Sequence, residues 1–73
     1  MTLERHVGIK VRKRRLELKL TQVELCDITH ISRQYLYEIE TGKKSMTIGT
    51  LQKLRKALRV SYNYFFSGSD ANS

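Results

Sequence analysis

Hydroxyl residues that favour helix starts recur along this 73-residue chain and divide it into short helical segments. The clearest start lies at "TQVE", where Thr21 is a good N-cap and Glu24, three residues later, completes a capping box. Leu20 and Leu25 flank this cap and are placed to form a hydrophobic staple across it. Three later apolar segments follow a similar residue: Ser32, Thr47 and Ser61. Because period-two alternation is absent over any useful length, the sequence predicts an all-α fold.

Apolar residues at helical spacing predict five helices, at about 4–18, 22–28, 33–40, 48–59 and 62–66. The stripes expected to face the core in the first, third and fourth helices are Val7, Val11, Leu18, Leu36, Ile39, Ile48, Leu51, Leu54 and Leu58. In the second helix, Leu25 and Cys26 are expected to face inward, with either Ile28 or Thr29. Gly42 follows the third helix as a residue that adopts a positive φ at little cost.

The length and the cysteine count limit the kind of protein. We expect residues 1–66 to form one small domain, and the polar residues 67–73 to form a flexible tail. A single cysteine excludes an intramolecular disulfide and a cysteine-based zinc finger, and it is compatible with a reducing cytosol. No segment resembles a signal peptide, and no apolar run approaches the ~20 residues that cross a bilayer.

The charge indicates the class of partner. The chain has 14 Lys and Arg against 7 Asp and Glu, a formal net charge of +7. Such a basic domain is attracted to polyanions, with nucleic acid as the first candidate and an anionic membrane surface as an alternative. Within the densest run of charge, 12–15, we expect Lys13 and Arg14 to lie on a solvated helix face.

No catalytic triad, paired acid, phosphate loop or cofactor motif is present, so we expect neither an enzyme nor a cofactor. His6 and His30 are too far apart in sequence to indicate a metal site.

Two short helices joined by a three- to four-residue break, with flanking helices for support, are typical of a helix-turn-helix. The stretch "TQVELCDITHISRQYLYEIETGKK" resembles the helix-turn-helix of the Cro/C1-type (XRE) family of DNA-binding regulators. The resemblance runs from near "VRKRR" through "LRKALRV", and it rests on Gly8, Val11, Arg12, Arg15, Leu20, Thr21, Gln22, Leu25, Ser32, Leu36, Ile39, Glu40, Gly42, Leu51, Leu54 and Leu58. It implies a five-helix, lambda-repressor-like domain whose third helix lies in the DNA major groove.

The resemblance also assigns structural positions. Arg15 and Glu40 match a paired Arg and Glu in several family members, which implies a partly buried ion pair between the first and third helices. Cys26 stands where the family prefers Ala, so we interpret it as a small apolar filler and not a redox thiol. His30 departs from the Gly that the family usually has in the turn, and His adopts positive φ more often than most residues.

Candidate base-reading residues lie at the start of the third helix. With Leu36 and Ile39 facing the core, the outward residues are Arg33, Gln34, Tyr37 and Glu38. Arg33 can pair with guanine O6 and N7, and Gln34 with adenine N6 and N7. The resemblance carries the family's base-reading positions onto Arg33, Gln34 and Glu38, and Glu38 either accepts from cytosine N4 or orients Arg33. A generic phosphate contact for Arg33 and a solvated position for Gln34 remain as alternatives.

Candidate phosphate contacts surround this helix. Free N–H groups at the start of the second helix favour an anion, and the family uses the position of Gln22 for backbone contacts. Tyr35 is either a phosphate contact or a semi-buried core residue, and Tyr37 is expected at the sugar-phosphate wall or a thymine methyl. The full set of candidates is Gln22, Thr21, Tyr35, Tyr37, Lys43, Lys44 and Arg12.

The aromatic cluster "SYNYFF" predicts a dimer. A monomer of this size reads few bases, and family members usually dimerise on palindromic half-sites ~34 Å apart. We expect Phe65 in the core, and Tyr62 and Phe66 at a two-fold interface with the fourth helix. The alternative is that all these aromatics cover the core of the monomer.

The resemblance therefore implies a sequence-specific transcriptional regulator, a dimeric repressor or autoregulator on a palindromic operator, similar to the controller proteins of restriction–modification systems. The expected partners are double-stranded DNA and a second copy of the chain, with RNA polymerase or a protein toxin as a further partner. An antitoxin-type regulator that mainly binds a toxin and a membrane-surface protein are the alternative functions. We expect a cytoplasmic protein of prokaryotic or phage type, associated with the nucleoid, without a small-molecule ligand domain and without membrane binding.

Overall fold

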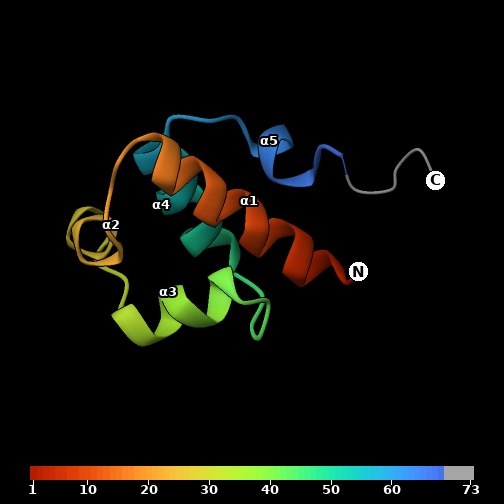
Figure 1. Cartoon of the computed structure of the whole chain (residues 1–73), viewed down its shortest axis with the longest axis horizontal. Helices are drawn as coiled ribbons and strands as arrows, with labels where there is room; N and C mark the ends of the chain where they lie inside the picture. Colours follow the sequence, from red (N-terminus) through yellow and green to blue (C-terminus); the bar gives the residue numbers. More distant parts are fainter. Residues whose placement is uncertain (69–73) are drawn as a thin grey trace.

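The computed structural model describes residues 1–68, and all regular structure in this range is helical. The helices are α1 (Leu3–Glu17), α2 (Gln22–Thr29), α3 (Arg33–Glu40), α4 (Ile48–Leu58) and α5 (Tyr62–Phe66). Each expected helix is present, with bounds that differ by no more than one residue from those expected. α1 packs against α3, α4 and α5, and Figure 1 shows it running across the molecule with α3 below it. Of the expected tail, Ser67 and Gly68 are described and 69–73 lie outside the described residues.

Side-chain caps start most of the helices. The capping box of α2 is complete: the Glu24 N–H donates to Thr21 Oγ1 at 3.0 Å, and the Thr21 N–H donates to Glu24 Oε1 at 2.8 Å. Ser32 and Thr47 accept from the backbone N–H three residues later, as expected. Ser61 is the N-cap residue of α5, as expected, but its side chain makes no cap hydrogen bond.

Residues with positive φ follow four of the helices, α1 to α4. His30 terminates α2 at φ 60° and ψ 31°, which confirms that the turn needs the left-handed conformation that the family fills with Gly. Lys19 and Arg59 adopt the same φ of 59° after α1 and α4, and neither was expected from its residue type. Gly42 has the expected positive φ, 77°, after α3.

The core forms where the helices meet. Its fully buried side chains are Val11, Leu25, Leu36, Ile39, Leu54, Leu58 and Phe65. At its edge one expectation is wrong, that of Ile48, and the open choice between Ile28 and Thr29 is resolved. Ile48 is 84% exposed. It is the first residue of α4, and this end of the apolar stripe of α4 is not covered by another helix of the described chain. In α2, Thr29 is the buried residue and Ile28 is exposed, since the Thr29 hydroxyl donates to the Leu25 carbonyl at 2.7 Å.

Arg14 does not lie on a solvated face, contrary to expectation. Its Nε donates to the carbonyl oxygen of Leu58 at 2.9 Å, and the side chain is partly buried. The last carbonyls of a helix lack partners within the helix, so this bond satisfies one of them and ties α1 to the end of α4. Lys13 is exposed, as expected.

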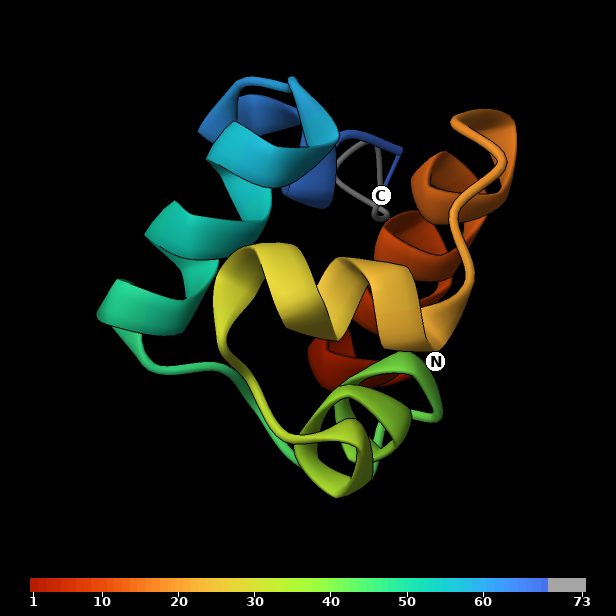
Figure 2. The ribbon, with the colours of Figure 1, turned by 90° about the vertical axis from the view of Figure 1, so that its left-hand side faces the viewer.

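Helices α2 and α3 form the helix-turn-helix. Figure 2 shows α2 running across the view and α3 seen end-on below it, joined by the turn at 30–32. α3 approaches α1 closely at Gly8, where an added Cβ would clash with the Ile39 carbonyl oxygen and lie 3.0 Å from the Glu40 carbonyl oxygen. Within residues 1–68, none of the helices has the length and apolarity that a membrane span requires.

Candidate nucleic-acid interface

Helix α3 has one buried side and one exposed polar side. Leu36 and Ile39 are each 1% exposed, so they fix the helix against the body. Arg33, Gln34 and Tyr37 are exposed on the other side. This is the division that the spacing of the two aliphatic residues predicts, and it places polar groups at the N-terminal end of α3, where they can approach another molecule.

Arg33 presents a free guanidinium. Within residues 1–68 its side chain has neither a hydrogen bond nor an ion pair, so its five N–H donors are available to a ligand. It lines a shallow hollow of about 290 Å³ together with Gln22, Gln34 and Tyr37. The structure thus brings the start of α2 and the start of α3 to one surface, although they are eleven positions apart in sequence.

Glu38 lies beside Gln34 one turn along α3. Gln34 Nε2 donates to Glu38 Oε2 at 3.1 Å, and Lys44 Nζ is 3.4 Å from Glu38 Oε1. The hydrogen bond from Gln34, reinforced by Lys44, holds the pKa of the Glu38 carboxyl below its ordinary value. Within residues 1–68, the side-chain partners of Glu38 are Gln34 and Lys44, and not Arg33. The i,i+4 spacing of Gln34 and Glu38 is a sequence signal for this contact.

The turn after α3 places two lysines at the edge of this surface. Lys44 pairs with Glu38, and Lys43 Nζ lies 5.5 Å from the centre of the Tyr37 ring, within the range of a cation–π contact. Tyr35 differs from Tyr37. It is partly buried against the core, and its hydroxyl donates to the Ser45 carbonyl at 3.5 Å. These contacts support the core interpretation of Tyr35, since the hydroxyl proton already has an acceptor in the chain.

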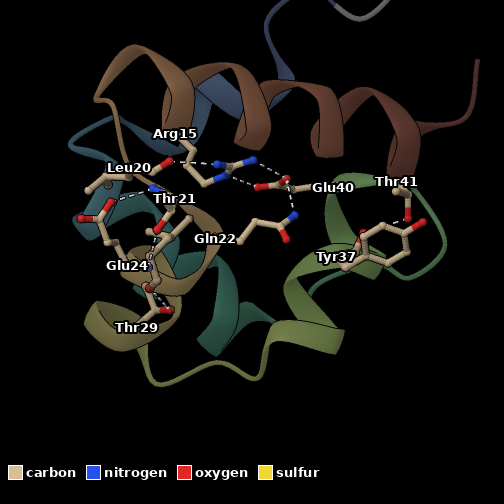
Figure 3. A network of polar contacts seen from close by, with 10 residues as sticks. Arg15, Leu20, Thr21, Gln22, Glu24, Thr29, Tyr37, Glu40 and Thr41 are labelled. Carbon is tan, nitrogen blue, oxygen red and sulfur yellow. Dashed lines mark hydrogen bonds and ion pairs between the residues drawn. The ribbon is translucent and has the colours of Figure 1, made fainter.

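A buried polar network supports the interface from behind (Figure 3). Arg15 Nε donates to Glu40 Oε2 at 2.7 Å, and Nη2 donates to Oε1 at 3.1 Å, so the expected ion pair is present. Arg15 Nη1 also donates to the Leu20 carbonyl at 2.8 Å, next to the cap of α2. Gln22 Nε2 donates to Glu40 Oε1 at 3.1 Å, a contact that the sequence did not indicate. Through Glu40, the network joins α1, the start of α2 and the end of α3.

The start of α2 has hydrogen-bond donors that an anion could use. Its capping box occupies the Thr21 hydroxyl as an acceptor but leaves the hydroxyl proton free. The Gln22 side chain donates to Glu40, and the backbone N–H of Gln22, in the first turn of α2, has no acceptor within the helix. Arg12 is exposed but lines a different hollow, of about 530 Å³, with Arg5, Ile9, Lys13 and Leu16. The structure does not bring Arg12 to the hollow at Arg33.

The aromatic cluster divides between core and surface. Phe65 is fully buried, and the partly buried Tyr64 donates its hydroxyl to the Lys10 carbonyl at 3.3 Å. Tyr62 and Phe66 are 43% and 38% exposed, and the Arg55 guanidinium lies 4.9 Å from the centre of the Tyr62 ring. An apolar hollow of about 130 Å³ adjoins this surface, lined in part by Leu3, Val7, Met46, Leu51 and Phe66.

The candidate metal and redox groups are few. Cys26 is a buried free thiol, and burial raises its pKa above the ordinary value. This environment fits an apolar filler, because a reactive thiol needs a lowered pKa. His6 Nε2 donates to the Ser67 carbonyl oxygen at 2.9 Å. Among residues 1–68, no group of three or more His, Cys, Asp and Glu is placed to hold a metal ion.

Comparison with known proteins identifies relatives of this arrangement. A family model described as helix-turn-helix (HTH_3) matches residues 11–65. A protein named as an uncharacterized transcriptional regulator in the ATPase CF(0) region of Rhodospirillum rubrum is 37% identical over 65 residues, which cover 89% of this chain and 60% of that protein. The immunity repressor protein of Bacillus phage phi105 is 37% identical over 54 residues, which cover 74% of this chain and 38% of the repressor. This chain therefore spans about 40–60% of the length of these two relatives.

A solved structure has the same fold over most of its length. The restriction–modification controller protein C.Esp1396I, a tetramer in complex with its natural 35 base-pair operator, is similar with a TM-score of 0.79 and 33% sequence identity. The match covers 90% of this chain and 87% of the controller protein.

Proposed function

This chain belongs to the HTH_3 family of helix-turn-helix transcriptional regulators, the Cro/C1-type (XRE) group, and on that premise we propose that it is a dimeric repressor that reads a palindromic operator through α3. The observation that carries the proposal is the exposed, unpaired Arg33 beside Gln34 at the N-terminal end of a helix whose other side is buried. In helix-turn-helix docking, this end of the second helix reaches base edges in the major groove. Arg33 then pairs with guanine and Gln34 with adenine.

The surrounding groups position the DNA backbone. The backbone N–H groups in the first turn of α2, at Gln22, donate to one phosphate, and Lys43 and Lys44 approach others from the turn after α3. Tyr37 lies between these two sets and contacts the sugar-phosphate wall. Arg12, on a separate part of the surface, meets the backbone outside the half-site. The formal net charge of +7 supports the long-range attraction that such binding requires.

Selection of DNA from a random duplex pool tests this proposal. The selected duplexes are expected to share two inverted half-sites about one helical turn apart. The titration of a selected and a scrambled duplex is repeated at two salt concentrations. The logarithm of the binding constant falls linearly with the logarithm of the salt concentration, and each phosphate contact contributes about 0.9 to that slope. Lys43→Ala is expected to lower the slope by about that amount on both duplexes. A pool that yields no shared sequence, with equal binding to the scrambled duplex, contradicts sequence-specific function.

Dimerisation through α5 is the second part of the proposal. Tyr62 and Phe66 keep more than a third of their surface exposed. Phe66 also lines the apolar hollow near Leu3 and Met46, which a second copy can cover. The two-fold repeat of the operator then mirrors the symmetry of the protein. The related controller protein assembles as a tetramer on its operator, which supports self-association in this family.

Sedimentation of the wild type and of Phe66→Ala at several concentrations tests this interface. The wild type is expected to be a dimer at micromolar concentration, and Phe66→Ala is expected to weaken the dimer. Ile28→Ala is the matched control, because Ile28 is an exposed aliphatic residue on α2. A wild type that stays monomeric at high micromolar concentration, or a dimer that Ile28→Ala weakens and Phe66→Ala does not, contradicts this assignment.

A further inference from the structure

The contacts of Glu38 indicate a role beyond the reading of a base. Its side chain is 20% exposed in the middle of the outward side of α3. Each carboxylate oxygen has its own partner: Oε2 accepts from Gln34 Nε2 at 3.1 Å, and Oε1 lies 3.4 Å from Lys44 Nζ. Glu38 therefore connects a residue at the start of α3 to the turn that follows the helix.

We propose that Glu38 is a positioning residue, which holds the amide of Gln34 in one orientation for reading a base pair and does not itself read one. This inference rests on the proposed DNA-binding function and specifies how one of its residues acquires its selectivity. It assigns Gln34, and not Glu38, the contact with the base.

The chemistry of the two groups determines the orientation of the amide. An ionised carboxylate accepts hydrogen bonds and has no proton to donate. Only the nitrogen of the Gln34 amide can therefore face Glu38, and the Gln34 oxygen must point away from it. The pKa of Glu38 lies below its ordinary value, so the carboxylate is ionised at neutral pH and this constraint is maintained.

A fixed amide discriminates between bases better than a free one. In the major groove, adenine presents an acceptor and a donor in a set order, whereas cytosine presents a donor and thymine an acceptor. An amide that rotates by half a turn exchanges its donor and acceptor, and so it can match several of these patterns. An amide held by Glu38 keeps its oxygen and its second N–H in set places, and it favours one pattern.

Lys44 makes the carboxylate compatible with a polyanion. An uncompensated negative charge on α3 would repel phosphates, and the cation of Lys44 opposes that repulsion. The same carboxylate provides no favourable contact to DNA of arbitrary sequence. Glu38 is thus expected to increase the sequence specificity of binding and not the affinity for DNA of any sequence.

A double-mutant comparison tests the proposal. The intact protein, Glu38→Ala, Gln34→Ala and the double variant are titrated with the selected operator and with every single-base change in one half-site. Circular dichroism confirms that each variant is folded, and Arg33→Ala serves as the reference for base reading. We expect Glu38→Ala and Gln34→Ala to reduce the preference at the same base pair, each by about tenfold. The double variant is expected to lose no more than either single variant.

The outcomes separate this inference from the proposed function. If Glu38→Ala reduces the preference at a different base pair, and adds to the effect of Gln34→Ala, then Glu38 reads a base itself and the inference is overturned. If Glu38→Ala leaves all preferences unchanged while Arg33→Ala reduces one, the inference fails and the proposed function stands. A wild type without any base preference contradicts the proposed function. The NMR titration of the Glu38 carboxyl is a readout without DNA: Gln34→Ala should raise its pKa toward the ordinary value, and an unchanged pKa contradicts the contact.

Discussion

Arg15 on α1 and Glu40 at the end of α3 form a buried ion pair in which both carboxylate oxygens accept from the guanidinium. Each residue is only 7% exposed, and the Gln22 amide adds a third hydrogen bond to the carboxylate. A buried pair of this kind contributes little net stability, but removal of one partner leaves a charge without compensation. The position of α3, and with it the interface, therefore depends on this pair.

Glu40→Gln is expected to reduce the free energy of unfolding by about 3 kcal/mol or more, because it leaves the Arg15 cation buried without an opposite charge. Urea denaturation at low temperature measures the change, since a domain this small has little stability to lose. Glu17→Gln is the matched control: Glu17 pairs with the partly exposed Arg14 at 3.4 Å, and an exposed pair contributes at most about 1 kcal/mol. Equal midpoints for Glu40→Gln and the wild type would show that the pair has no structural role.

Gly8→Ala is expected to destabilise the domain by roughly 1–3 kcal/mol, because the new methyl group meets backbone carbonyls of α3 that cannot move aside independently. Thermal unfolding followed by circular dichroism measures this change. Gly49→Ala is the control, since nothing lies within 4 Å of a Cβ at that helical position, and it should be neutral or stabilising by up to about 1 kcal/mol. If both variants unfold at the same temperature, α1 and α3 are not in close contact at Gly8.

His30→Gly is expected to stabilise the domain by up to about 1 kcal/mol. The left-handed conformation at φ 60° costs an L-residue roughly 1–2 kcal/mol, and the greater freedom of Gly in the unfolded chain offsets part of the gain. His30→Val should be destabilising, because a β-branched side chain is least compatible with this conformation. Chemical denaturation of both variants measures the two changes, and a stabilising His30→Val contradicts the assigned conformation.

Cys26 predicts a pH dependence of known sign. Burial raises its pKa in the folded chain, so between the unfolded and folded pKa values the unfolded state binds fewer protons and stability falls as the pH rises. The same shift makes the folded thiol a poor nucleophile. Alkylation by iodoacetamide at pH 8.5 should be at least about tenfold slower in buffer than in urea that unfolds the chain. Equal rates in the two conditions would show that Cys26 is an accessible, ionisable thiol.

The local signals of the sequence are sufficient for the helices and for the exposed side of α3. Thr21, Ser32 and Thr47 mark helix starts, because each side chain accepts a hydrogen bond from the backbone N–H three residues later. The spacing of Leu36 and Ile39 is enough to identify the buried side of α3. Ile48 is an exception, because periodicity assigns it to a stripe but cannot show where the neighbouring helices end.

The contacts that sequence reasoning missed join distant segments. Arg14 reaches the carbonyl of Leu58, forty-four positions away, and Gln22 reaches Glu40, eighteen positions away. No local pattern specifies such pairs, since they depend on how the helices pack. Likewise Lys19 and Arg59 adopt positive φ because their helices must turn there, although neither residue type favours that conformation.

The most direct test of the central claim, that α3 reads bases through Arg33, is a titration of Arg33→Ala on the selected operator and on its single-base variants. We predict a loss of about 1–3 kcal/mol on the selected operator and a loss of preference at one base pair, with the other preferences retained. An equal loss of affinity on every sequence would contradict the claim, because it would make Arg33 a phosphate contact that carries no sequence information.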